Sequence, residues 1–168
     1  GASRSATAAP PASGPRVVRL DGPFPLESGR TLPGLELAYQ TWGTPTGDNA
    51  VWVCHPLTKD AHAAGPSAGG QRGWWDDLVG PGRLLDTRRY FVVASAVLGG
   101  SGGSTGPRSV DPATGRPWGP DFPVVTLGDM VAAQARLADH LGLRRLALVT
   151  GPCFGGQQAL EWAVRFPD

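Results

Sequence analysis

The sequence lacks the features that would assign it to a membrane-spanning, secreted or nucleic-acid-binding class. Its 168 residues contain no apolar run near the ~18 residues of a membrane span, and the N-terminal stretch lacks the apolar core of a secretory signal. The formal net charge is +1, with basic and acidic residues spread along the chain, so no basic stripe indicates nucleic acid or an anionic membrane. We therefore expect a cytoplasmic protein that binds neither.

Cysteine is scarce as well. The two cysteines, Cys54 and Cys153, are expected to be free thiols, because disulfides are rare in a cytoplasmic setting. No metal ion and no tightly bound cofactor are expected, and no cofactor-binding residue is identified. The sequence has no repeat period.

The composition indicates one soluble globular domain, with 40% apolar and 17% charged residues. Residues 1–15 are almost entirely Ala, Pro, Ser and Gly, with little to bury, and are predicted to form a mobile extension. The domain is predicted to span residues 16–168. The 25 glycines and 17 prolines indicate many loops.

The pattern of apolar residues predicts an α/β protein. Three pieces between residues 16 and 43 alternate between apolar and polar residues, which favours antiparallel strands at a sheet edge. Continuous apolar runs at 49–55, 90–98 and 144–150 are typical of parallel strands buried on both faces. Thr126 and Asp129 have capping-box spacing before an apolar stripe, and Gly142 ends the predicted helix. This helix joins two of the runs in a βαβ unit.

Two segments, 55–82 and 99–122, exceed the usual length of a connection. Each follows the C-terminal end of a predicted parallel strand, where open α/β sheets place their ligands. We therefore expect both loops to lie near a functional site.

The pattern Gly-x-nucleophile-x-Gly occurs three times, centred on Ser101, Ser104 and Cys153. It indicates a catalytic residue only where a strand leads in and a helix leads out, because the strained turn between them presents the nucleophile to substrate. Both serines are followed by Pro107 and a loop. Cys153 has the strand at 144–150 before it and the helical pattern GGQQALEWAVRF after it, with Ala159, Leu160, Ala163 and Val164 at helical spacing.

These flanking elements predict that Cys153 is a nucleophile. The start of a helix carries unpaired N–H groups and the positive end of the helix dipole, which favour a thiolate, and the Phe154 N–H becomes half of an oxyanion hole. The alternative is a small buried apolar residue, the commonest use of a free cysteine. His55 and His62 are interpreted as loop or structural residues rather than general bases.

Ordered blocks of sequence resemble the N-terminal part of the homoserine O-acetyltransferase family. They include AYQTWG (38–43), HPLTKDAHAAG (55–65), GWWDDLVGPGRLLDTRRYFVV (73–93), the 97–131 segment beginning VLGGSGGSTGPRS, and LVTGPCFGGQQALEWAVRFPD (148–168). The resemblance implies an α/β-hydrolase fold. The chain would form the N-terminal portion of a mostly parallel sheet with antiparallel first strands, with the rest of the sheet and the lid missing.

The resemblance also implies ping-pong transfer of an acetyl group from acetyl-CoA to homoserine, a step in methionine biosynthesis. Carried over by position, the nucleophile is Cys153, and the oxyanion hole is formed by the backbone N–H groups of Leu57 and Phe154. The small-molecule substrates are an acyl-CoA and homoserine, and the full-length protein is expected to be a homodimer.

The sequence departs from the family at the site. The family usually reads GGSMGG at the turn, with Ser as nucleophile, where this chain reads GPCFGG, and it reads HALTG where this chain has HPLTK. The catalytic Asp and His follow the nucleophile in such enzymes, but all three His of this chain precede Cys153. We therefore expect an N-terminal fragment that is inactive alone. The alternatives are a serine O-acyltransferase, a homoserine O-succinyltransferase, an esterase, or a non-catalytic relative with an inert Cys153.

Overall fold

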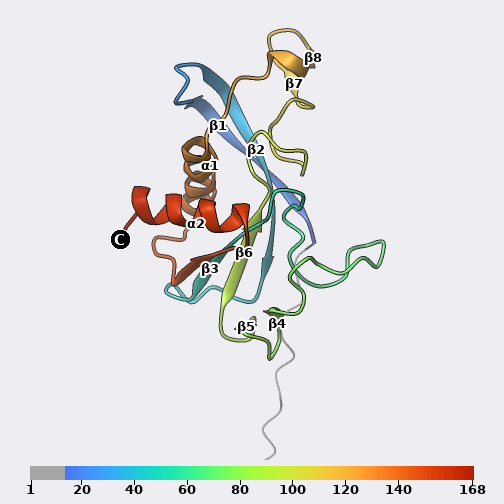
Figure 1. Ribbon diagram of the computed structural model, residues 1–168, viewed down its shortest axis with the longest axis vertical. Helices are drawn as coiled ribbons and strands as arrows, with labels where there is room; N and C mark the ends of the chain where they lie inside the picture. Colours follow the sequence, from blue (N-terminus) through green and yellow to red (C-terminus); the bar gives the residue numbers. More distant parts are fainter. Residues whose placement is uncertain (1–13) are drawn as a thin grey trace, which may run out of the picture.

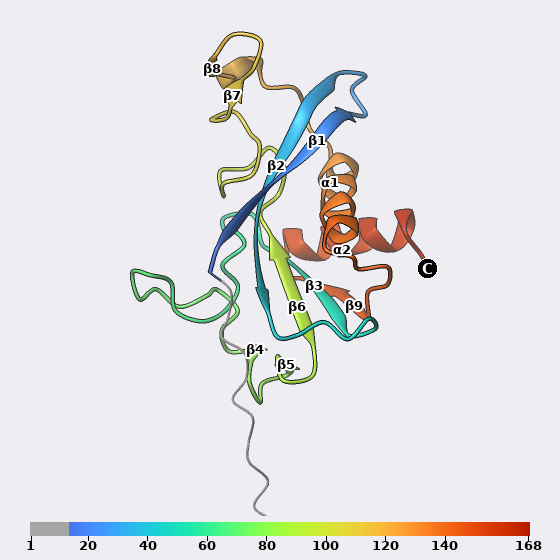
Figure 2. The same ribbon diagram turned by 180° about the vertical axis from the view of Figure 1, so that it is seen from behind.

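The computed structural model describes residues 14–168, which form a five-stranded mixed sheet with two α-helices on one face (Figure 1). The view from behind shows the same two helices on one side of the sheet and the long loops on the other (Figure 2). The mobile extension predicted for residues 1–15 falls almost wholly on residues 1–13, which lie outside the described part. The assignment of residues 16–168 to one domain stays a prediction.

The sheet combines an antiparallel hairpin with parallel strands. Its order is β1-β2-β6-β3-β9, with β1–β2 and β2–β6 antiparallel and β6–β3 and β3–β9 parallel. The strands are β1 (Arg16–Pro25), β2 (Thr31–Trp42), β3 (Ala50–Cys54), β6 (Phe91–Ser95) and β9 (Leu148–Thr150). This arrangement confirms the predicted α/β class with antiparallel first strands followed by parallel strands.

The first strands differ in number from the prediction. The three alternating pieces form two strands, because the first two pieces are joined in β1 across a register shift between Asp21 and Phe24. Gly22 has a φ of 95° there, a conformation that glycine adopts without steric cost. The segment between Asp21 and Phe24, which contains Gly22 and Pro23, resembles a turn in the sequence. In the structure it forms a bulge within one continuous strand.

The parallel strands differ in burial. Every residue of β3 and β6 is buried, as their unbroken apolar runs predict. The third run was expected to be equally buried, and this is wrong: β9 has three residues, none of them buried, and Leu148 is 44% exposed. The reason is position, since β9 is the last strand in the sheet order and has a neighbour on one side only.

The two long loops contain small elements and cover different parts of the sheet. The first loop and the segment after it carry β4 (Val79–Gly80) and β5 (Leu85–Asp86), and the second loop carries β7 (Val110–Asp111), β8 (Arg116–Pro117) and the 3₁₀ helix η1 (Gly119–Asp121). Residues of the first loop and its continuation pack against alternate side chains of β3 and β6 in a second apolar cluster: Ala63, Ala64, Val79, Leu85, Val51, Val53, Val92 and Ala94.

Helix α1 (Leu127–His140) begins as the sequence predicts. The Thr126 hydroxyl accepts a hydrogen bond from the Asp129 N–H (3.1 Å), and the Asp129 carboxylate accepts one from the Thr126 N–H (2.9 Å). The same carboxylate also accepts from the Glu27 N–H at the β1–β2 turn (3.0 Å). The capping box thus fixes the start of α1 and ties it to the hairpin.

Helix α2 (Phe154–Arg165) buries a face that differs from its apolar pattern. Its buried residues are Gly155, Gln158 and Trp162, whereas Leu160 is 70% exposed and Val164 is 77% exposed. The helix is therefore held to the sheet by a glycine, an amide and an indole.

Replacing Asp129 with Ala is expected to lower the free energy of unfolding by about 2 kcal/mol, because a cap bond and the bond to the hairpin are both lost. The midpoint of urea denaturation measures the change. Asp139→Ala, at an exposed position in the last turn of α1, is the matched control and should leave the midpoint almost unchanged. An equal shift for both variants would contradict the role given to the capping box.

Candidate active site

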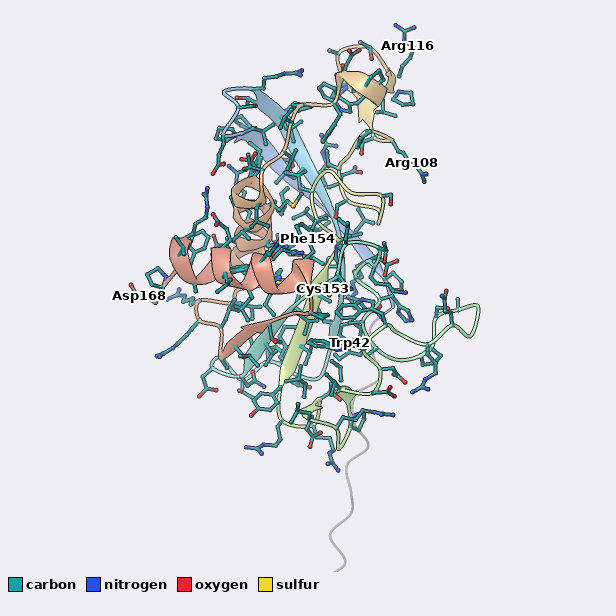
Figure 3. The ribbon with its side chains drawn as sticks, in the orientation of Figure 1. Trp42, Arg108, Arg116, Cys153, Phe154 and Asp168 are labelled. Atoms are coloured by element: carbon teal, nitrogen blue, oxygen red, sulfur yellow. The ribbon has the colours of Figure 1, made fainter. Side chains whose placement is uncertain are left out.

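Cys153 occupies a sharp turn between β9 and α2, and its side chain is exposed (Figure 3). Its backbone has φ 52° and ψ −119°, and among residues 14–168 it is the one non-glycine residue with a positive φ. Such a conformation costs about 1–3 kcal/mol and persists where the surroundings enforce it. The turn therefore has the strained strand-turn-helix geometry that selects Cys153 from the three sequence matches.

Two glycines allow this turn to lie directly against the end of β3. A Cβ atom added to Gly151 or to Gly155 would overlap the carbonyl oxygen of Cys54. Gly156 is less constrained, since an added Cβ would lie 3.2 Å from the Gly151 oxygen. The backbone that continues from β3 into the 55–60 loop is thus held against the start of α2.

Two backbone N–H groups of this region are free to bind a ligand. At the start of α2 the Gly155 N–H bonds to the Pro152 oxygen (2.8 Å) and the Gly156 N–H to the Cys153 oxygen (2.9 Å). Within residues 14–168 neither the Phe154 N–H nor the Leu57 N–H donates a hydrogen bond. These are the two donors assigned to an oxyanion hole from the resemblance. The Leu57 side chain is 77% exposed and so takes no part in packing.

His55 is a structural residue, as expected. It is 2% exposed, and both ring nitrogens are engaged: Nε2 accepts from the Val97 N–H (3.1 Å), and Nδ1 donates to the Pro56 oxygen (2.8 Å). Burial lowers the pKa of His55 below its usual value, which keeps the ring neutral. With no free nitrogen, the ring cannot accept a proton from Cys153.

His62 also serves the loop rather than the nucleophile. Its Nδ1 lies 3.1 Å from Gln40 Oε1 and its Nε2 lies 3.0 Å from the Gln71 oxygen, so it links the 55–82 loop to β2. Across the described residues, no His, Asp or Glu forms a hydrogen bond with the Cys153 sulfur.

A buried amide network lies under the turn and was missed from the sequence. Gln158 Nε2 donates to the His55 carbonyl (3.1 Å), and Gln158 Oε1 accepts from Gln134 Nε2 of α1 (2.8 Å). Gln134 Oε1 in turn accepts from Trp162 Nε1 (2.7 Å). The available signal was spacing, since Gln158 lies three residues after Gly155 and four before Trp162. Gln158 is therefore a polar residue on the buried side of α2, together with Gly155 and Trp162.

Ser101 and Ser104, the centres of the other two Gly-x-nucleophile-x-Gly matches, do not lie on a strand-turn-helix like that of Cys153. Ser104 is buried, and its hydroxyl donates to the Ala96 oxygen (2.7 Å) and accepts from the Ala38 N–H (3.0 Å). Ser101 lies exposed on a bend. Neither is followed by a helix.

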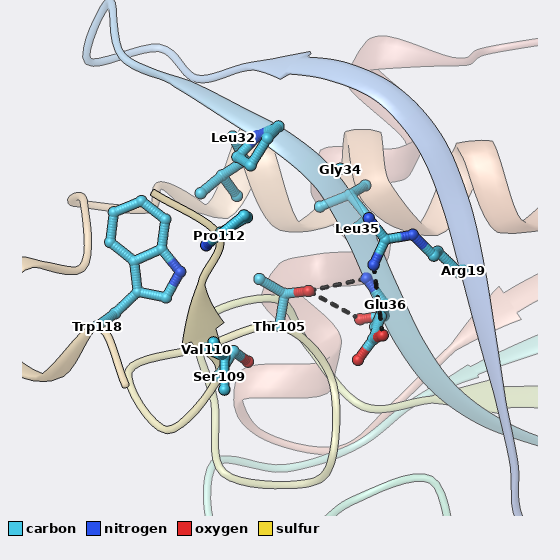
Figure 4. A pocket seen from close by; sticks show the side chains of 11 residues that line it. Arg19, Leu32, Gly34, Leu35, Glu36, Thr105, Ser109, Val110, Pro112 and Trp118 are labelled. Atoms are coloured by element: carbon cyan, nitrogen blue, oxygen red, sulfur yellow. Dashed lines mark hydrogen bonds and ion pairs between the residues drawn. The ribbon is translucent and has the colours of Figure 1, made fainter. Parts of the chain in front are cut away.

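A cavity of about 370 Å³ lies between β2 and the 105–118 segment, apart from Cys153 (Figure 4). Its polar groups are largely paired with one another: the Thr105 hydroxyl accepts from the Glu36 N–H (2.8 Å), and the Arg19 guanidinium lies 3.7 Å from the Glu36 carboxylate. The residues described also contain no cluster of metal-ligating side chains and no helix long and apolar enough to cross a membrane.

The mixed sheet, the positive φ at Cys153 and the helix that follows it define a protein of the α/β-hydrolase fold class. Comparison with solved structures supports this fold class. The homoserine O-acetyltransferase from Bacillus anthracis matches with a TM-score of 0.84 and 35% identity, over 92% of this chain and 44% of that one. The crystal structure of esterase E22 matches with a TM-score of 0.83 and 33% identity, over 91% and 44%.

Curated sequences are closer still. The homoserine O-acetyltransferase of Symbiobacterium thermophilum is 57% identical over 157 residues, covering 91% of this chain and 41% of the relative. The homoserine O-succinyltransferase of an Azoarcus species is 54% identical over 158 residues, covering 92% and 42%. The resemblance to the homoserine O-acetyltransferase family is thereby confirmed, and the chain spans about two fifths of the length of these relatives. No protein-family model matches the chain.

Proposed function

We propose that this chain supplies the nucleophile and the oxyanion hole of an acyl-CoA-dependent homoserine O-acyltransferase, with acetyl-CoA as the acyl donor. The observation that carries the proposal is the strained backbone of Cys153 beside the unpaired N–H of Phe154. Strain of this kind is retained where it aims a reacting group. The relatives named homoserine O-acetyltransferase support the substrate assignment.

In the first half-reaction the Cys153 thiolate attacks the carbonyl carbon of acetyl-CoA. A C–S bond to Cys153 forms, and the carbonyl oxygen becomes an oxyanion that accepts hydrogen bonds from the Phe154 and Leu57 N–H groups. The intermediate then breaks its C–S bond to CoA, which leaves as a thiolate and takes a proton from water. One thioester replaces another, so this step is close to isoenergetic.

In the second half-reaction the hydroxyl of homoserine attacks the acyl-enzyme, the O-acyl bond forms, and Cys153 is released. The attacking hydroxyl must lose a proton to a general base. His55 cannot be this base, because both of its ring nitrogens are already engaged. We assign the base to the part of the relatives' length that this chain does not span.

The test separates the two half-reactions. Incubation of the full-length protein with acetyl-CoA alone, followed by intact-mass analysis, should show one acetyl group on Cys153, and addition of homoserine should then release CoA continuously. Retention of the unmodified mass by a folded chain whose Cys153 is alkylated by iodoacetamide would indicate an inert thiol and contradict the proposal.

A second candidate is transfer from succinyl-CoA, favoured by relatives that are named homoserine O-succinyltransferase at nearly the same identity. Transfer to serine, or to water as in an esterase, is a third. Competition between acetyl-CoA and succinyl-CoA, and between homoserine and serine, followed by mass spectrometry of the products, distinguishes them. Dominant O-succinylhomoserine, O-acetylserine or free acetate would each replace the leading assignment.

The remaining proposals concern the whole protein. We place it in the cytoplasm as a homodimer that uses acyl-CoA as a substrate rather than as a bound cofactor. Sedimentation equilibrium of the full-length protein tests the dimer, and a monomer at micromolar concentration would contradict it.

A further inference from the structure

In the turn that follows β3, one peptide plane is held by two hydrogen bonds. The Pro56 carbonyl oxygen accepts two hydrogen bonds, one from His55 Nδ1 (2.8 Å) and one from the Lys59 N–H (3.0 Å). Residues 14–168 contain no cis peptide bond, so the C=O of Pro56 and the N–H of Leu57 point in opposite directions across one plane. Two donors that hold the Pro56 oxygen therefore also set the direction of the Leu57 N–H.

The His55 ring is itself locked in the state that this requires. Val97 N–H donates to Nε2 (3.1 Å), so Nε2 carries no proton and the neutral ring carries its proton on Nδ1. The His55 carbonyl is held by Gln158 Nε2 of α2 (3.1 Å). Three contacts thus join His55 to the end of β6, to its own turn and to the helix that begins at the nucleophile.

We propose that His55 is a positioning residue that aims the Leu57 N–H into the oxyanion hole by donating a hydrogen bond from Nδ1 to the Pro56 carbonyl. The inference rests on the proposed acyl transfer at Cys153. His55 does not touch the substrate, and its effect passes through one peptide plane. Phe154, the other donor, depends on the start of α2 and is independent of the ring.

Two substitutions divide the functions of the ring. Asn places its side-chain Nδ2–H₂ close to the position of the Nδ1 atom of His, so His55→Asn keeps a donor for the Pro56 oxygen and loses the acceptor for the Val97 N–H. Gln is one carbon longer and places an oxygen near the position of Nε2, so His55→Gln keeps the acceptor and loses the donor to Pro56. The two variants are matched, since each removes one of two similar hydrogen bonds.

Two reactions of the Cys153 thiol distinguish a loss of oxyanion binding from a general loss of structure at the turn. Acylation of Cys153 by acetyl-CoA passes through an oxyanion, whereas alkylation by iodoacetamide displaces iodide and forms none. Cys54 does not interfere, because burial raises its pKa to about 12 while Cys153 is exposed. Both rates are measured by intact mass on the full-length protein.

His55→Gln is expected to slow acylation by about 10²-fold, the usual effect of losing one oxyanion-hole donor, and to leave alkylation unchanged. His55→Asn is expected to recover most of that loss. Equal losses of acylation in both variants, or parallel losses of acylation and alkylation in His55→Gln, would show that the ring acts only through stability and would overturn the proposal.

The orientation is also measured without any acylation. Long-range ¹H–¹⁵N NMR correlation of His55 should show the neutral form with its proton on Nδ1, and the Leu57 amide signal should shift more in His55→Gln than in His55→Asn. A ring protonated on Nε2 would contradict the inference. A chain that shows the expected NMR result but is alkylated and never acylated would refute the proposed function and leave the positioning role supported.

Discussion

Replacing Cys153 with Ala is expected to abolish the acyl-enzyme and to lower the rate of acyl transfer by about 10⁴-fold or more, as loss of a nucleophile does elsewhere. Ala removes the sulfur that forms the thioester, and no neighbour replaces it: Ser101 and Ser104 lie on another loop, and the Ser104 hydroxyl is already bonded at both its donor and acceptor positions. Release of CoA and the mass of the protein after incubation with acetyl-CoA measure the loss.

The other cysteine is the control for this substitution. Cys54, the last residue of β3, is buried, and its sulfur lies 4.0 Å from Gln134 Oε1 of α1. Cys54→Ala should therefore leave one acetyl group per chain, whereas Cys153→Ala should leave none. If the Cys153→Ala variant still acquires an acetyl group, the nucleophile lies elsewhere and the assignment fails.

Replacing Gly155 with Ala is expected to lower the free energy of unfolding by about 3 kcal/mol and to slow acylation with it. The new Cβ would overlap the Cys54 carbonyl oxygen, so either α2 or the end of β3 must move. The two proposed oxyanion-hole donors lie at the start of α2 and three residues after the end of β3. Thermal or urea unfolding gives the loss of stability.

Gly156→Ala is the matched control, because both glycines lie in the first turn of α2 and both gain helix propensity from Ala. Its Cβ would lie 3.2 Å from the Gly151 oxygen, a contact that a small adjustment relieves. Gly156→Ala should thus be close to neutral in stability. Equal destabilisation by the two substitutions would show that helix packing, rather than contact with β3, decides the cost.

The sequence predicted the parts of the fold that depend on local pattern. The capping box at Thr126 and Asp129 is a three-residue spacing, and it is formed as expected. The apolar runs of β3 and β6 are buried as predicted because both strands have neighbours on each side. The run that ends in β9 is also apolar from Leu146 to Val149, but it lies at the sheet edge, and an apolar run does not encode how many neighbouring strands it will have.

In the candidate site, too, the features set by consecutive residues were predicted and those set by distant partners were missed. The turn around Cys153 was predicted correctly because its strand, turn and helix are consecutive in the sequence, and the role of Cys153 as nucleophile stays a prediction. Gln158 was missed because its partners, His55 and Gln134, are 103 and 24 residues away, and a glutamine in an amphipathic helix is ordinarily a surface residue. The assignment of the Leu57 N–H to an oxyanion hole came from the resemblance and stays a prediction.

The exposed side chain of Leu57 has a consequence for redesign. Its backbone N–H is held through the Pro56 carbonyl, while its side chain is 77% exposed and packs against nothing that fixes the turn. Every residue except Pro keeps that N–H, so position 57 can be varied in a saturation library without removing the donor. Under the proposed acyl transfer, substitutions of residue 57 are expected to change the side chain beside the turn while the proposed donor is kept.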